Sequence, residues 1–139
     1  MPQYLADTSI WGWARSGRRP DIEEKLAVRL LRDEIAICAP VTLELMHRAT
    51  SGEEYEMIYE TLVAPLNRLA LSDGIGERAI DVQREMARAT HGNHLRPAND
   101  FLIAAIAEAA ENGDVILWFL DEAMRIICEQ TGQAYEAES

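Results

Sequence analysis

The chain has 139 residues, 48% of them hydrophobic and 27% charged, and its formal net charge is −11 at pH 7. This length suits one domain, expected over residues 1–139, and the balance excludes a disordered chain. The longest nearly apolar stretch, residues 101–110, is far shorter than the roughly 20 residues of a membrane span, and no secretory signal is visible. The negative charge disfavours nonspecific binding to a polyanion, so any nucleic-acid contact needs local basic patches.

The cysteines, Cys38 and Cys128, both fall inside apolar runs, and the three histidines do not lie near them. The pattern favours two buried, reduced thiols over a disulfide, and it excludes a zinc-type cluster. Without an export signal, we expect a cytoplasmic protein and no membrane partner.

Short, uniformly apolar segments alternate with helical patterns along the chain. The expected strands are residues 4–6, 34–39 and 115–119, and residues 68–71 form either a short strand or a connector. Strands with so few polar residues are typical of a parallel sheet that helices cover on both faces. The sequence therefore predicts an α/β fold, a three-layer sandwich with a short central parallel sheet.

Apolar residues at helical spacing predict the helices, and polar residues mark their ends. Asp21 is a possible N-cap, Ser51 is an N-cap with Glu54 as its capping-box partner, and Gly132 closes the last helix. One helix is expected through residues 11–13, one from residue 21 onward and one after residue 40. Further helices are expected over residues 51–66, 75–89, 97–112 and 121–130.

Four acidic residues stand where strands end or helices begin. Asp7 ends the first strand, Asp121 follows the strand 115–119, and Glu44 and Asp100 fall in the first turn or so of a helix. Ligands bind at the carboxyl ends of open parallel sheets. Each acid alone also suits a helix cap. Four together would crowd like charges unless a cation compensates them, so a metal site and ordinary capping both remain open.

Two other classes with an acid after the first strand do not fit. A phosphoryl-aspartate hydrolase requires a second Asp two residues after Asp7, where this chain has Ser9. A receiver domain requires a pair of acids before the first strand ends, and residues 4–6 offer none.

The acids lie in motifs that resemble those of PIN-domain ribonucleases, and in particular the VapC toxins of bacterial type II toxin–antitoxin systems. The likeness runs from about residue 4 to residue 133, in order and at family-like spacing. Its segments are Leu5-Ala-Asp-Thr-Ser-Ile, Pro40-Val-Thr-Leu-Glu-Leu, the helix from Glu77 to Ala87, Arg96-Pro-Ala-Asn-Asp-Phe-Leu-Ile-Ala-Ala, and Asp121 ahead of Arg125-Ile-Ile and Thr131-Gly-Gln.

The resemblance implies a Mg²⁺- or Mn²⁺-dependent endonuclease for single-stranded RNA, with Asp7, Glu44, Asp100 and Asp121 as its catalytic and metal-binding acids. Asp7 and Asp100 are the expected direct ligands. Glu44 and Asp121 are expected to bind a second ion, hold water or act as the base. Ser9 matches a hydroxyl of the family motif, is expected to hydrogen-bond the site, and is a candidate RNA-binding residue.

The last motif departs from the family pattern. Relatives usually carry a small polar residue two positions before this Asp, and another Asp with a Phe soon after it. This chain has Phe119, Ala123 and Met124 at those places. The departure makes Asp121 the weakest of the four assignments.

Basic residues near the third acid form a candidate RNA-binding stripe. Arg84, Arg88 and His91 follow at helical spacing, and His94 and Arg96 continue towards Asp100. The other interpretation is an ordinary solvated face.

Apolar surfaces suggest protein partners. Trp11, Trp13 and the stripe from Tyr55 to Leu66 suit the core or an interface, for which the resemblance suggests a cognate, VapB-like antitoxin and a homodimer partner. Two alternatives to a toxin remain: a PIN-fold RNA-processing nuclease without an antitoxin, and a catalytically silent PIN-fold binding module.

Overall fold

The computed structural model describes residues 2–89, 94–110 and 114–139. Its strands are β1 (Gln3–Ala6), β2 (Ile35–Ile37), β3 (Asn67–Arg68), β4 (Val115–Phe119) and β5 (Tyr135–Ala137). Its helices are α1 (Thr8–Ser16), α2 (Pro20–Leu31), α3 (Ala39–Met46), α4 (Gly52–Ile58), the π-helical turn η1 (Tyr59–Val63), α5 (Ile75–Ala89), α6 (Ala98–Ala109) and α7 (Glu122–Thr131). The last residues of the helix expected over residues 97–112 lie outside the described residues.

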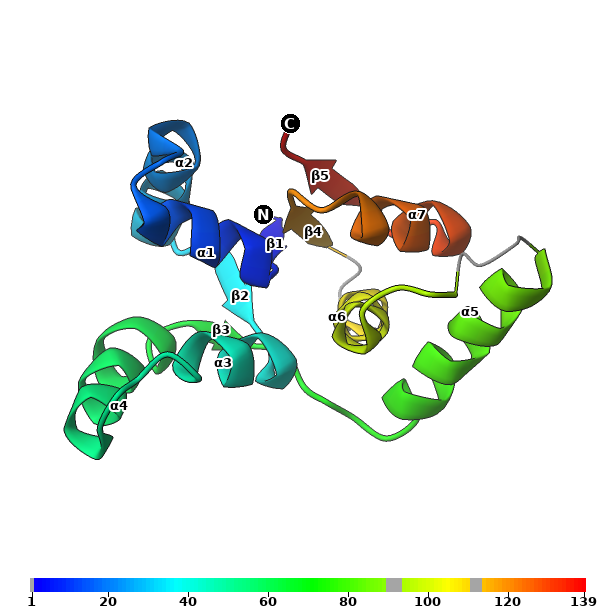
Figure 1. The fold of residues 1–139 in the computed structure, drawn as a ribbon, viewed down its shortest axis with the longest axis horizontal. Helices are drawn as coiled ribbons and strands as arrows, with labels where there is room; N and C mark the ends of the chain where they lie inside the picture. Colours follow the sequence, from blue (N-terminus) through cyan, green and yellow to red (C-terminus); the bar gives the residue numbers. More distant parts are fainter. Residues whose placement is uncertain (1, 90–93, 111–113) are drawn as a thin grey trace.

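All five strands are parallel, in the order β3-β2-β1-β4-β5. Helices α1 and α2 lie on one side of the sheet, and α6 and α7 lie on the other with α5 outside them (Figure 1). The predicted three-layer α/β fold with a central parallel sheet is confirmed. From β1 the chain adds β2 and β3 on one side, and it then crosses back to add β4 and β5 on the other side of β1. The strand order therefore reverses between β1 and β4, which defines a topological switch point.

The core consists of the apolar residues of the sheet and the helix faces against it. Leu5, Leu117 and Trp118 are fully buried in neighbouring central strands. Trp11, which belongs to α1, is only 2% exposed. The helix expected over residues 75–89 is confirmed as α5, and Ile75, Ala79, Val82 and Met86 form its buried stripe. Trp13 remains 36% exposed. No helix in the described ranges is long and apolar enough to cross a membrane.

The two cysteines are free and buried, as expected. Burial raises the pKa of the Cys38 thiol to about 11 and that of Cys128 to about 12, so both stay protonated at neutral pH. They are packing residues.

Two local expectations were wrong. Asp21 does not cap α2, because the helix starts at Pro20 with Arg19 at the N-cap, and Asp21 instead pairs with Arg19 at 2.9 Å. Strand β5 was not expected, because it is short, only half-buried and carries Glu136 at its centre. The Glu136 carboxylate pairs with Arg29 on α2 at 2.8 Å, a tertiary contact that local sequence does not reveal.

Glycines at two positions give opposite stability predictions. Gly132 ends α7 with φ of 81°, whereas Gly76 lies within α5 and has open space around it. Gly132→Ala should destabilise the fold by about 1 kcal/mol because an L-residue is strained at this φ. Gly76→Ala should stabilise it by about 0.5–1 kcal/mol through helix propensity. Urea denaturation of the two variants checks both signs, and a stabilising Gly132→Ala would contradict the left-handed helix end.

Candidate metal centre

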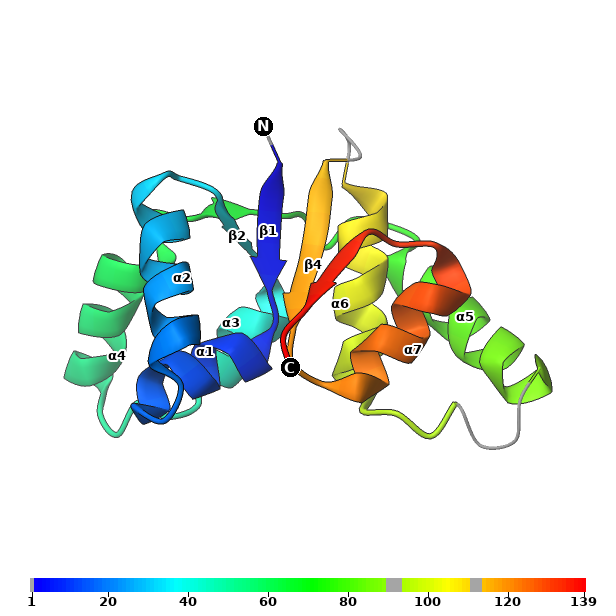
Figure 2. The same ribbon diagram turned by 90° about the horizontal axis from the view of Figure 1, so that it is seen from above.

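The four acids of the sequence analysis come from four elements around the switch point. Asp7 directly follows β1 and Asp121 directly follows β4, while Asp100 lies in the first turn of α6. Helix α3 begins at Ala39, so Glu44 lies in its second turn rather than near its start. The N-terminal ends of α1, α3, α6 and α7 meet near the carboxyl ends of β1 and β4 (Figure 2).

Asp7 and Asp121 are helix caps as well as site residues. Asp7 Oδ1 accepts a hydrogen bond from the Ser9 amide at 3.0 Å and another from the Ser9 hydroxyl. Asp121 Oδ1 accepts one from the Ala123 amide at 2.9 Å. The capping and metal-site interpretations are therefore compatible, since each cap uses one carboxylate oxygen.

Ser9 joins the two loops that carry Asp7 and Asp121. While its hydroxyl donates to Asp7, the same oxygen accepts from the backbone amide of Leu120 at 3.2 Å. Ser9 thus fixes the end of β1 against the end of β4. Its expected contact with RNA stays a prediction.

Glu44 is held by a residue that the sequence analysis did not single out. Asn99 Nδ2 donates to Glu44 Oε1 at 2.6 Å, which joins α3 to α6 beside Asp100. The signal in the sequence was weak: an amide residue next to the third acid, with no pattern linking it to a residue 55 positions away.

Asp100 is the most deeply perturbed acid of the group. Asp100 is only 9% exposed, and its Oδ2 atom has no hydrogen-bond partner among the described residues. Desolvation by burial raises its pKa to about 7, and the charges of Asp7, Asp121 and Glu44 raise it further in that order. The structure therefore brings all four acids within electrostatic range of one another.

Asp7 is perturbed in the same direction. Burial raises the pKa of its carboxyl to about 6, against the lowering effect of hydrogen bonds from Ser9 and Ile10, and the charge of Asp121 adds to the rise. In both Asp7 and Asp100 the charged form of the carboxyl group is disfavoured. Acids of this kind, gathered at one place, are typical of a site that binds a cation.

The donor set fits a hard divalent cation such as Mg²⁺ or Mn²⁺. Every candidate ligand is a carboxylate, and Asp100 offers a buried oxygen that no protein group satisfies in the described ranges. In those ranges, no three carboxylate, imidazole or thiol side chains already have metal-coordinating spacing. A bound cation would therefore have to draw the carboxylates closer together.

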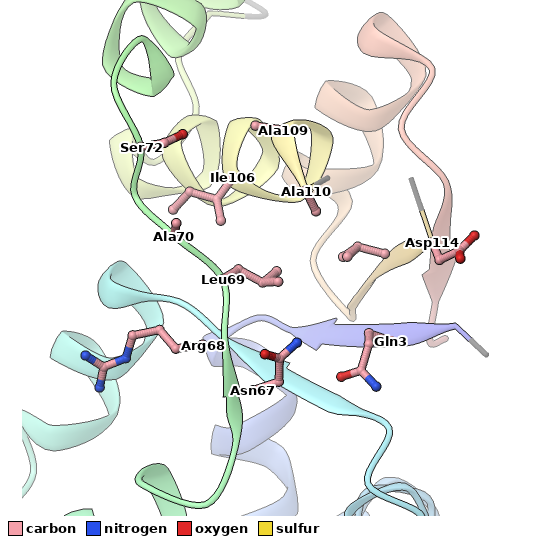
Figure 3. Close-up of a pocket in the computed structure, with 11 residues that line it drawn as sticks. Gln3, Asn67, Arg68, Leu69, Ala70, Ser72, Ile106, Ala109, Ala110 and Asp114 are labelled. Atoms are coloured by element: carbon pink, nitrogen blue, oxygen red, sulfur yellow. The ribbon is translucent and has the colours of Figure 1, made fainter. Parts of the chain in front are cut away.

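A well-defined hollow of the described residues lies away from the four acids. It measures about 480 Å³ and is lined by Gln3, Asn67 and Asp114 at the amino ends of β1, β3 and β4 (Figure 3). None of the four acids lines it. The hollow therefore does not mark the candidate metal centre, which the chemistry of the four acids places at the carboxyl ends of the strands.

The candidate RNA-binding residues lie in two places. Arg84 and Arg88 are exposed on α5, with Arg84 only 4.0 Å from Asp81. Arg96 is half-buried in the segment before α6, and His91 lies outside the described residues. The face of α5 is mixed in charge rather than purely basic.

Comparison with known proteins identifies the family of the chain. Residues 4–130 match the family model of the PIN domain. The chain is 34% identical over 135 residues, 96% of its length and 93% of the relative's, to Ribonuclease VapC18 from Mycobacterium tuberculosis. The chain therefore belongs to the PIN-domain family, and within it is similar to a VapC ribonuclease.

Two solved structures share the fold. The crystal structure of DNA-bound VapBC from Salmonella typhimurium matches with a TM-score of 0.71 at 16% identity, over 99% of this chain and 98% of the other. That of VapBC2 from Rickettsia felis, bound to a DNA fragment from its promoter, matches with a TM-score of 0.66 at 18% identity, over 98% of both chains.

Proposed function

We propose that this chain is an endoribonuclease that cleaves single-stranded RNA with Mg²⁺ or Mn²⁺ and acts as the toxin of a toxin–antitoxin pair. The observation that carries the proposal is the buried, unpartnered Asp100 oxygen among three further acids at the switch point of a PIN-family sheet. The similarity to a protein named a ribonuclease supports RNA as the substrate. We treat residues 1–139 as one PIN-like domain.

Asp7 and Asp100 are the proposed direct ligands, with Glu44 and Asp121 completing the site. A cation held by these carboxylates would polarise a phosphodiester oxygen and lower the pKa of water for in-line attack. Ser9 holds Asp7 in orientation, and the caps of α1 and α7 fix where Asp7 and Asp121 stand. Glu44 or Asp121 serves as the base or holds water in the site.

The divergent residues around Asp121 favour an active enzyme over a silent module. Phe119 and Met124 are fully buried, and Ala123 is 9% exposed, so all three serve the core. Asp121 keeps its place at the start of α7 despite them. The departure from the family pattern thus changes packing residues and leaves the acid present.

Exposed apolar side chains support a protein partner. Leu43 on α3 is 70% exposed, and Met57 on α4 is 60% exposed, near the stacked pair Tyr55 and Tyr59. Large exposed apolar residues often mark interaction surfaces. We propose a VapB-like antitoxin as the partner, together with a homodimer. A small gene for an antitoxin beside the gene of this chain would distinguish a toxin from a PIN-fold nuclease in RNA processing.

The direct test is cleavage of a single-stranded RNA by the purified chain. We expect Mg²⁺ or Mn²⁺ to support cleavage, a chelator to stop it, and Asp7→Asn and Asp100→Asn to lose it. Full cleavage by both variants would refute the site, and no cleavage by the unaltered chain with either metal would favour the silent module.

The α5 arginines give a prediction about RNA affinity. Arg84→Glu with Arg88→Glu should weaken RNA binding at least about 10-fold at low salt, because lost phosphate contacts and added repulsion act together. Arg32→Glu is the matched control: Arg32 is an exposed arginine at the C-terminal end of α2, remote from the acids. Binding is measured by fluorescence anisotropy of a labelled RNA. Equal affinities of the double variant and the control would leave α5 as an ordinary solvated face.

A further inference from the structure

Asn99 differs from the four acids in what it offers the site. It precedes Asp100 in the first turn of α6, and its side-chain amide donates to Glu44 Oε1 at 2.6 Å. It is a neutral donor among carboxylates, so it satisfies one Glu44 oxygen without adding negative charge. The other Glu44 oxygen remains for a cation.

Glu44 needs such support more than the other acids do. Asp7 and Asp121 are oriented by amides two residues further along their own loops. Glu44 lies in the second turn of α3, where the helix amides are already paired and no cap is available. Within the described part of the chain, the hydrogen bond to Glu44 comes from another helix, across 55 residues of sequence.

The link also couples two acids of the site. Because Asn99 and Asp100 are consecutive on α6, a bond from Asn99 to Glu44 sets the position of Glu44 relative to Asp100. Helices α3 and α6 pack against each other, which supports this spacing from the backbone.

We propose that Asn99 is a positioning residue that orients the Glu44 carboxylate for metal binding, an inference that rests on the proposed function. Groups that orient a ligand typically contribute 10–100-fold to metal affinity. Asn99 acts through Glu44 and does not itself contact metal or RNA.

The experiment is a double-mutant cycle read out by Mn²⁺ affinity, measured by calorimetric titration of the full chain. Asn99→Ala should weaken binding about 10-fold, and Asn99→Leu, similar in size but without a donor, should do the same. In a Glu44→Ala background, Asn99→Ala should have less than about a 2-fold further effect, because its target is gone. Thermal melts check that each variant folds. The KM for RNA of Asn99→Ala at saturating Mn²⁺ should be unchanged.

The matched control is Asn67→Ala. Asn67 is an exposed asparagine on β3, at the other end of the sheet, so this variant should bind Mn²⁺ normally. Unchanged affinity in both Asn99 variants, beside an unaltered chain that binds Mn²⁺ and cleaves RNA, would overturn the role of Asn99 alone. An equal loss in the Glu44→Ala background would overturn its action through Glu44. An unaltered chain that neither binds Mn²⁺ nor cleaves RNA would overturn the proposed function as well.

Discussion

Asp100→Asn should lower kcat/KM for RNA cleavage by about 1,000-fold while making the metal-free protein more stable. A metal centre supplies several kcal/mol of transition-state stabilisation, and each 1.4 kcal/mol is about a factor of ten in rate. The Asp100 carboxylate is buried, lacks a partner for Oδ2 in the described residues, and faces three like charges. Replacing it with a neutral amide should therefore increase the free energy of unfolding by about 1–3 kcal/mol at neutral pH.

The opposite signs make this prediction specific. A residue that only packs would lose activity and stability together, whereas a ligand held at a cost in stability loses activity and gains stability. Asp114→Asn is the control, because Asp114 is an exposed acid at the amino end of β4. It should leave both quantities unchanged. A destabilised Asp100→Asn would contradict the electrostatic account of the site.

The metal-free protein should lose stability as the pH rises from about 4 to 7. The pKa of Asp7 is raised to about 6 and that of Asp100 to about 7, from 3.8 in the unfolded chain. In this window the folded protein binds more protons than the unfolded chain, so folding becomes less favourable as the pH increases. Each group contributes up to about 1.4 kcal/mol per pH unit, so the slope should be roughly 2 kcal/mol per pH unit and should flatten above pH 7.

Added Mn²⁺ should reverse this trend. Metal binding needs ionised carboxylates, so the stabilisation by Mn²⁺ grows as the pH rises. Melting temperatures between about pH 5 and 8, with a chelator and with Mn²⁺, measure both effects. The double variant Asp7→Asn with Asp100→Asn should show neither. A slope that persists in the double variant would assign the pH dependence to other groups. Asp21 acts the other way, since Arg19 lowers its pKa to about 2, but its effect falls below about pH 4.

Much of the fold followed from local patterns. The strand at residues 115–119 and the helix at 75–89 have the predicted bounds, because a uniform apolar run and a four-residue stripe are strong, local signals. Strand β5 escaped prediction because its central Glu136 is paired with Lys25 and Arg29 of a distant helix. The N-cap at Asp21 was wrong because the helix begins at Pro20, which places the N-cap two residues earlier, at Arg19.

The sequence was enough to predict which acids lie together in the candidate site. It did not predict the hydrogen bonds that hold them in place. The end of a strand and the start of a helix are visible in sequence, which was enough to group Asp7, Asp100 and Asp121. The bridge from Ser9 to Leu120 and the bond from Asn99 to Glu44 join segments 111 and 55 residues apart. Their partners depend on sheet order and helix packing, which one sequence does not encode locally.

Titration of Mn²⁺ into the metal-free protein, at a pH of about 8, tests the central claim most directly. If Asp7 and Asp100 are the direct ligands, the unaltered chain should bind Mn²⁺ saturably, and Asp7→Asn should weaken that binding at least about 10-fold. Equal Mn²⁺ affinity in the unaltered chain and in Asp7→Asn would contradict a metal centre at the carboxyl ends of β1 and β4.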